Sequence, residues 1–234
     1  MSVPHACHPP ARLKRSWTSR RCLVSWVATL ALSSLPAVAA DPPDSLMAAL
    51  TLQGDPARGK AAFDNCIGCH RKDASGRAAD PIPRLSGQHA SVIIKQVSDI
   101  RGGRRINDPM KPYVDGAAMD AQTLADIAGY LQALPMSGTL GKGPGTDLER
   151  GKSLFERDCA GCHGARGEGI AEAFHPMLAA QHYRYLLREM QLIRDGNRGN
   201  SNPAMVQLVK TYPPADLEAV ADYLSQLPPS VKPR

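Results

Sequence analysis

One five-residue motif occurs twice in this chain of 234 residues. It reads Cys66-Ile67-Gly68-Cys69-His70 and Cys159-Ala160-Gly161-Cys162-His163, and the two copies lie 93 residues apart. C-x-x-C-H is the attachment motif for c-type haem. Cysteines three residues apart share one face of a helical turn, so both thiols can reach one porphyrin, and the adjacent histidine supplies the proximal iron ligand. The sequence therefore predicts two covalent haem c groups, attached at Cys66, Cys69, Cys159 and Cys162, with His70 and His163 as iron ligands.

Three other uses of these four cysteines are weaker interpretations. They could form two disulfides, act as a redox-active dithiol, or bind one zinc ion. Zinc ribbons separate their C-x-x-C pairs by about 15–20 residues, far less than the 93 residues here. None of the three uses explains a histidine directly after both pairs.

The offset of 93 residues extends well beyond the cysteines. The matching segments are Pro83 to His89 with Pro176 to His182, Ile100-Arg101 with Ile193-Arg194, and Tyr130-Leu131 with Tyr223-Leu224. Upstream, Arg58-Gly59-Lys60 matches Arg150-Gly151-Lys152 with a shift of one residue. The chain is therefore predicted to contain two tandem domains of one fold.

Each repeat carries three helical patterns and no convincing strand pattern. The first helix is expected to begin at Asp55-Pro56, a cap followed by proline, and in the second repeat at a capping box over 146–149. Apolar residues at helical spacing predict a second helix over 88–101 and 181–194, and a third over 121–134 and 215–227. We expect an all-α fold of two tandem domains, each with one covalently bound haem. Because aromatic residues make up only 5% of the chain, a haem is expected to fill each core.

Residues 1–40 read as a secretory signal peptide. Five basic residues (Arg12, Lys14, Arg15, Arg20 and Arg21) precede an apolar run over 23–35 and small residues before Asp41. An uncleaved anchor is the alternative, but the run is short for a span of about 20 residues. We expect export to the periplasm, and haem domains over 41–136 and 147–234 joined by a glycine-rich linker over 137–146.

Most of the formal charge of +6 lies in this leader. Without its five basic residues the chain has 23 basic and 22 acidic side chains. This balance removes the main argument for a nucleic-acid partner, since such proteins carry a strongly basic surface. We expect protein redox partners, no nucleic acid, and at most peripheral association with a membrane.

A methionine thioether is the expected sixth ligand, because this soft donor favours Fe(II) and raises the potential. In the second repeat Met205 follows Asn202-Pro203-Ala204 and precedes the third helix. In the first repeat the equivalent position is Pro112, and the nearest methionine is Met110. The predicted ligands are therefore Met205 and Met110. Met119 stays open as the alternative in the first repeat.

Three further histidines have weaker claims to the iron. His89 and His182 stand at the start of the second helix in each repeat, where we expect them to act as caps or to lie near the haem propionates. His175 has no counterpart in the first repeat and is expected to be a surface or packing residue.

The chain resembles the dihaem cytochrome c4 family of class I cytochromes c over nearly all of the sequence after the leader. The resemblance rests on four paired features: the R-G-K approach to each haem motif, the Gln88-His89 and Gln181-His182 segments, the glycine and arginine stretches near Gly103 and Gly196, and the closing helices with Tyr130 and Tyr223. It implies two tandem cytochrome c domains related by a pseudo-twofold axis, with haem edges facing across the interface. It also implies that Gly59 and Gly151 lie where the first helix crosses the last.

The resemblance further implies a non-enzymatic electron carrier. Its donors would be a membrane dehydrogenase or a cytochrome bc-type complex, and its acceptors a terminal oxidase or reductase. One alternative is a c-type subunit of a larger dehydrogenase or oxidase complex. Another is a haem enzyme such as a peroxidase or a thiosulfate dehydrogenase, which is disfavoured because no free cysteine remains after the leader and no second histidine is well placed.

Overall fold

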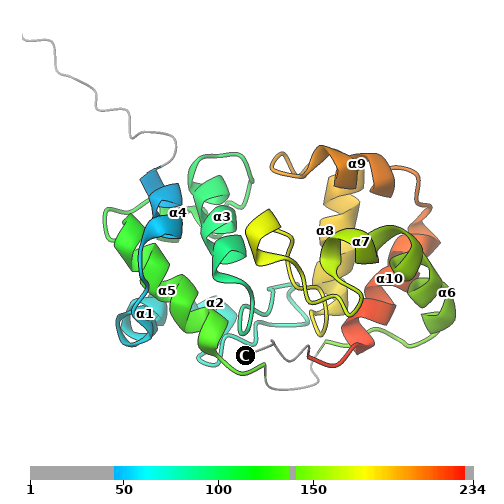
Figure 1. Ribbon diagram of the computed structural model, residues 1–234, viewed down its shortest axis with the longest axis horizontal. Helices are drawn as coiled ribbons and strands as arrows, with labels where there is room; N and C mark the ends of the chain where they lie inside the picture. Colours follow the sequence, from blue (N-terminus) through cyan, green and yellow to red (C-terminus); the bar gives the residue numbers. More distant parts are fainter. Residues whose placement is uncertain (1–44, 137–140, 230–234) are drawn as a thin grey trace, which may run out of the picture. The chain divides into compact units, whose positions relative to one another are not determined.

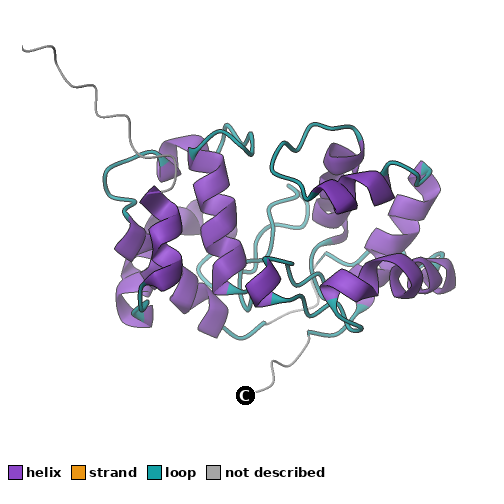
Figure 2. Ribbon diagram, turned by 45° about the horizontal axis from the view of Figure 1, so that its top comes forward, coloured by secondary structure: helices purple, strands orange, loops and turns teal. Residues whose placement is uncertain are grey.

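The computed structural model divides into two units, Met1–Ala39 and Ala40–Arg234. It describes residues 45–136 and 141–229, all of which belong to the second unit. The predicted signal peptide and residues 137–140 of the predicted linker lie outside the described residues. Within the described ranges the chain forms helices, turns and two isolated β-bridges, without strands (Figure 2). None of these helices combines the length and the apolar character that a membrane span requires.

The two halves repeat one order of helices (Figure 1). The first half contains η1 (Ser45–Thr51), α1 (Pro56–Phe63), η2 (Asp64–Cys66), α2 (Ile67–His70), α3 (Ala90–Arg101), α4 (Lys111–Val114) and α5 (Ala121–Ala133). The second half contains α6 (Leu148–Leu154), η3 (Phe155–Cys159), α7 (Ala160–His163), η4 (Ala171–Ala173), α8 (Tyr183–Arg194), α9 (Pro203–Val209) and α10 (Pro214–Gln226). The all-α prediction is confirmed. The short elements η1, α4, η4 and α9 were not predicted.

The first helices of the two halves, α1 and α6, begin differently. Asp55 caps α1 as predicted, because its side chain accepts hydrogen bonds from the backbone N–H groups of Ala57 and Arg58. The predicted capping box over 146–149 is wrong. The cap position of α6 is Asp147, whose side chain makes no capping bond, and the backbone N–H of Thr146 donates instead to Asp222 on α10. The carboxylate of Asp222 therefore binds the backbone at the start of α6, where the predicted box would have used the local side chain of Glu149.

Each core forms where the first and last helices of a half cross. α1 packs on α5, and α6 packs on α10. Gly59 and Gly151 lie at the two crossings: a Cβ added to Gly59 would lie 2.0 Å from the carbonyl oxygen of Asp126, and one added to Gly151 would lie 2.1 Å from that of Ala219. No other residue type fits such a close approach of two backbones. The crossing glycines implied by the family resemblance are confirmed.

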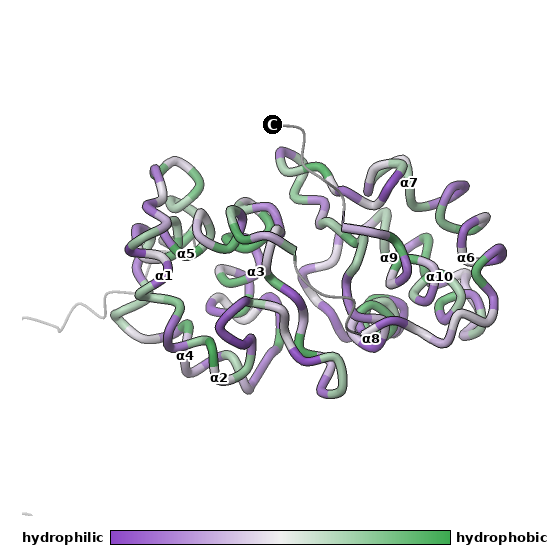
Figure 3. Tube along the Cα trace, turned by 90° about the horizontal axis from the view of Figure 1, so that it is seen from below, coloured by the Kyte–Doolittle hydropathy of each residue, from purple (hydrophilic) through white to green (hydrophobic). Residues whose placement is uncertain are grey.

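Aromatic pairs close both crossings. The ring centroids of Phe63 and Tyr130 are 5.8 Å apart, as are those of Phe155 and Tyr223. Apolar and polar residues are mixed along the helices (Figure 3), as expected for amphipathic helices that bury one face. η1 adds buried Leu46 to the first core, and the second half has no described equivalent of this element.

The two halves are joined by reciprocal hydrogen bonds of two glutamines. Gln88 donates to the carbonyl oxygen of Met177 at 3.0 Å and accepts from the Met177 backbone N–H at 3.0 Å. Gln181 makes the same pair with Arg84, at 2.9 Å in both directions. Each contact is the other shifted by 93 residues, so the halves are related by a pseudo-twofold axis.

The neighbouring histidines extend this symmetric interface. His89 Nε2 donates to the carbonyl oxygen of Glu168 at 2.8 Å, and His182 Nε2 donates to that of Ser75 at 2.7 Å. Ser75 and Glu168 follow the two haem motifs by five residues each. The interface therefore joins the start of the second helix in one half to the loop after the haem motif in the other.

Candidate haem-binding sites

Both C-x-x-C-H motifs fold into the same short helical turn. Cys66 and Cys159 stand at the N-caps of α2 and α7, while Cys69 and Cys162 lie inside these helices. The first cysteine of each pair is half-buried and the second is exposed. None of these four cysteines forms a disulfide in the described part of the chain. Each pair of thiols is therefore presented on one turn, as attachment to a single porphyrin requires.

A backbone carbonyl orients each predicted proximal histidine. His70 Nδ1 donates to the carbonyl oxygen of Pro83 at 3.3 Å, and His163 Nδ1 donates to that of Pro176 at 3.0 Å. Such a bond fixes the tautomer and leaves Nε2 with a lone pair for a metal. Burial lowers the pKa of both imidazoles below the ordinary value, which keeps the rings neutral near pH 7. Both histidines therefore have the form that iron ligation needs.

The chain reverses direction immediately after each histidine. Arg71 and Gly164 occupy equivalent positions with φ of 64° and 79°, a region that glycine adopts readily and other residues rarely. The loops then return, so that the carbonyl oxygen of His70 accepts from Gly76 N–H at 3.0 Å and that of His163 accepts from Gly169 N–H at 2.7 Å. These turns bring Pro83 and Pro176 back beside the imidazoles.

The three candidate methionines lie in different surroundings. Met205 is in the first turn of α9, half-buried against the second core together with Cys159. Met119 is half-buried against the first core together with Cys66. Met110 is half-buried at the N-cap of α4 and is not part of either core cluster. Met205 and Cys159 therefore pack against one core, and Met119 and Cys66 against the other.

The other histidines have structural roles. His89 and His182 occupy the N-cap positions of α3 and α8 but make no side-chain capping bond, because their rings reach across the interface instead. His175 is half-buried, with its ring centroid 5.8 Å from that of His163. A β-bridge between Ile170 and His175 holds it there. The sequence offered no signal for this position, since His175 has no counterpart in the first repeat.

Comparison with known proteins agrees with this architecture. The family model of cytochrome c matches residues 56–135 and 148–228. Cytochrome c4 of Pseudomonas aeruginosa is 30% identical over 217 residues, which cover 88% of this chain and 98% of the relative. The chain belongs to the cytochrome c4 family. The crystal structure of reduced recombinant cytochrome c4 from Pseudomonas stutzeri matches with a TM-score of 0.67 at 28% identity, covering 74% of this chain and 99% of that one.

A further relative has a more specific name. The thiosulfate dehydrogenase electron acceptor of Stutzerimonas stutzeri is 33% identical over 173 residues, covering 69% of this chain and 78% of the relative.

Cytochrome c4 proteins are dihaem c-type electron-transfer cytochromes, and this chain is one of them. Its residues fit two covalent haem c groups, because each half presents a thiol pair and a neutral, oriented imidazole. When bound, the haems supply reversible one-electron chemistry.

Proposed function

We propose that this cytochrome c4 is a periplasmic carrier that passes electrons from respiratory donors to a terminal oxidase or reductase. Residues 1–40 are then its export signal, and residues 41–136 and 147–234 its haem domains. The observation that carries the proposal is the direct connection of two equivalent haem sites: the loop after each haem motif accepts a hydrogen bond from a histidine of the other half, His89 or His182. A pair of sites joined in this way suits transfer between haems better than catalysis at one of them.

A redox titration of the full-length holoprotein tests this function. We expect two reversible one-electron steps, reduction by respiratory membranes, and reoxidation when a terminal oxidase is added. The same preparation should not turn over hydrogen peroxide or thiosulfate. Rapid cyanide binding to one of the two ferric haems would contradict the carrier function, because it would reveal an open catalytic iron.

A second candidate is an electron-transfer subunit of a larger dehydrogenase or oxidase complex. The named role of the Stutzerimonas stutzeri relative supports it. The two most exposed large apolar side chains of the described residues also lie in the first half, Ile106 at 78% and Tyr113 at 56%. The equivalent positions of the second half hold Gly199 and a half-buried Val206. Gentle isolation from native membranes distinguishes the two candidates, because a permanent subunit elutes with its complex and a free carrier elutes alone.

The sixth ligands are proposed to be Met205 and Met110. The packing of Met205 against the same core as Cys159 supports its assignment as the ligand of the second haem. Met119 packs against the core of the first half, and its counterpart Tyr212 is part of the core of the second half. A packing role in the fold therefore explains the burial of Met119. Met110 has no such packing role.

The Met205→Ala variant should lose one low-spin haem of the two. Without a thioether the second iron becomes five-coordinate, so half of the ferric haem is expected to turn high-spin and to bind cyanide quickly. Optical and electron paramagnetic resonance spectra measure both changes. Met110→Ala should do the same to the first haem, whereas Met119→Ala and the packing control Met47→Ala should not. A normal Met110→Ala spectrum with a high-spin Met119→Ala spectrum would reverse the assignment in the first half.

A further inference from the structure

The two halves differ by one residue directly before the haem motif. Phe63 and Cys66 are three residues apart, whereas Phe155 and Cys159 are four apart. Both phenylalanines are fixed in their cores, with 2% and 0% of their surface exposed. The additional residue therefore has to be accommodated between two fixed points.

The second half accommodates this residue as a π turn. In η3 the backbone N–H of Ala160 donates to the carbonyl oxygen of Phe155, five residues earlier, whereas the first half has the tighter 3-10 turn η2. Single π turns inside helices occur frequently at functional sites. Here the turn sets Asp158, half-buried, immediately before the haem-attachment residue Cys159.

A tyrosine from the other end of the half binds this carboxylate. The Tyr212 hydroxyl donates to Asp158 Oδ2, and Arg157 donates to the same oxygen at 2.6 Å. Tyr212 is 8% exposed and belongs to the core against which Met205 and Cys159 pack. The carboxylate is thus held beside Cys159, at the edge of the core against which Met205 also packs.

The carboxylate of Asp158 is more shielded from water than its charged partner. The Arg157 side chain is 63% exposed and that of Asp158 is 18% exposed, so water screens the guanidinium more than the carboxylate. The pKa of the neighbouring Cys159 thiol is raised to about 11, chiefly by burial and next by Asp158, whose effect exceeds the opposing effect of Arg157. In the first half the pKa of Cys66 is raised by burial and by Cys69. The counterparts of Asp158 and Tyr212 are Asn65 and Met119, which bring no charge.

We propose that Asp158, held by the hydroxyl of Tyr212, lowers the reduction potential of the second haem and so makes the two haems unequal. A ferric haem carries one more positive charge than a ferrous haem, and a nearby carboxylate therefore stabilises the ferric state. This inference rests on the proposed electron-carrier function and adds a determinant of potential to it.

The test is a potentiometric titration of full-length Asp158→Asn holoprotein. The second haem should become easier to reduce, with its ferrous-to-ferric ratio at a fixed potential rising by up to about tenfold, or about 59 mV for one electron. Proton NMR of the haem methyl groups, compared with the Met205→Ala variant that alters the second haem, identifies the haem that shifts. The reciprocal variant Asn65→Asp should lower the potential of the first haem.

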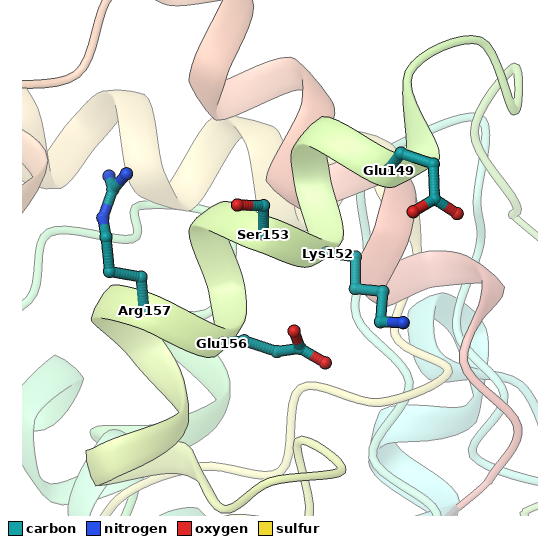
Figure 4. A pocket seen from close by; sticks show the side chains of 5 residues that line it. All are labelled: Glu149, Lys152, Ser153, Glu156 and Arg157. Atoms are coloured by element: carbon teal, nitrogen blue, oxygen red, sulfur yellow. The ribbon is translucent and has the colours of Figure 1, made fainter.

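Glu156→Gln is the matched control. It removes the same charge from the same π turn, but Glu156 is exposed in a shallow pocket with Glu149, Lys152, Ser153 and Arg157. Figure 4 shows Glu156 and Arg157 leaving the helix in different directions, with Glu156 on the side of Lys152. Glu156→Gln should leave both potentials unchanged.

Three results would overturn the inference. If Asp158→Asn shifts neither potential while both haems still titrate reversibly, the inference is wrong and the carrier function stands. If Asp158→Asn and Glu156→Gln shift the second haem equally, the potential depends on overall charge and the role given to Asp158 is wrong. If the unmodified protein shows no reversible one-electron steps, the carrier function fails, and this inference fails with it.

Discussion

The Gly59→Ala variant is expected to lose the folded first half. The added methyl group would lie 2.0 Å from the carbonyl oxygen of Asp126 and 2.9 Å from Tyr130 Cβ. Both neighbours belong to the adjacent helix α5, so relief requires the two helices to separate and to open the core between them. We expect a loss of more than about 4 kcal/mol, at the upper end for single substitutions. Gly151→Ala should do the same to the second half, where Ala219 O would lie at 2.1 Å.

Thermal unfolding followed by far-ultraviolet circular dichroism measures this loss, and limited proteolysis shows which half has opened. Gly129→Ala is the control within α5. A methyl group there meets nothing closer than 3.7 Å, and alanine favours a helix over glycine by about 0.5–1 kcal/mol. This variant should melt at the same temperature as the unmodified protein or higher. Equal melting of Gly59→Ala and Gly129→Ala would show that the helix crossing tolerates a side chain.

The second large effect is expected at a charge cluster between the halves. Glu189 Oε2 pairs with Arg105 at 3.0 Å and with Arg198 at 3.1 Å, and its other oxygen accepts from Arg188. The side chains of Arg105 and Glu189 are only 10% and 9% exposed. At the pseudo-symmetric position Gln96 accepts from both Arg105 and Arg198 but carries no charge. Glu189 is therefore the carboxylate that pairs with both guanidinium groups where they meet.

The Glu189→Ala variant should lose about 3–5 kcal/mol, because removing one partner leaves buried charges unpaired. Chemical unfolding of the holoprotein is expected to show this loss as a separation of the two halves into distinct transitions. Asp195→Ala, which removes the partner of Arg194 from an exposed pair, should change stability by less than about 0.5 kcal/mol. A single unchanged transition in Glu189→Ala would show that the halves hold together without this carboxylate.

The pH dependence of stability gives an independent measurement of the same cluster. Burial alone would raise the pKa of Glu189, but Arg105 and Arg198 outweigh it and hold the pKa below its ordinary value. A carboxyl whose pKa is lower in the folded state stabilises the protein above its unfolded pKa of about 4.3, and this contribution is lost as the pH falls through the folded value. Glu189→Ala should therefore lose less stability than the unmodified protein between neutral pH and pH ~3.

Much of the architecture was predictable because it follows local rules. The helices over 90–101 and 121–133 and their repeats lie within two residues of the predicted limits, since three or more turns give a clear apolar period. η1, α4 and α9 have seven residues or fewer, too few turns to show one. The capping box over 146–149 was a valid local pattern, but the distant Asp222 accepts from Thr146 instead.

The candidate haem sites likewise contain residues that the local sequence predicts and contacts that only the folded chain creates. The cysteines and proximal histidines were evident because each group stands in five consecutive residues. The carbonyls of Pro83 and Pro176 that orient the histidines were not, because only the return of the loop brings them close. The one-residue shift before Cys159 was visible in the sequence, but its consequence was not, because a π turn and a hydrogen bond to Tyr212 depend on the packed core.

By itself, the sequence determined the number of haems, the two-domain repeat and the helical class. These properties are encoded in adjacent residues or in a helical period, where the interacting groups are neighbours along the chain. The tertiary structure alone decided the symmetric interface, the balance of one carboxylate against two arginines, and the unequal surroundings of the two haem motifs. The contacts that join the two halves and that bind Tyr212 to Asp158 have partners separated by 54 to 107 residues. Their strength depends on burial and on which charges face each other, and neither exists before the chain packs.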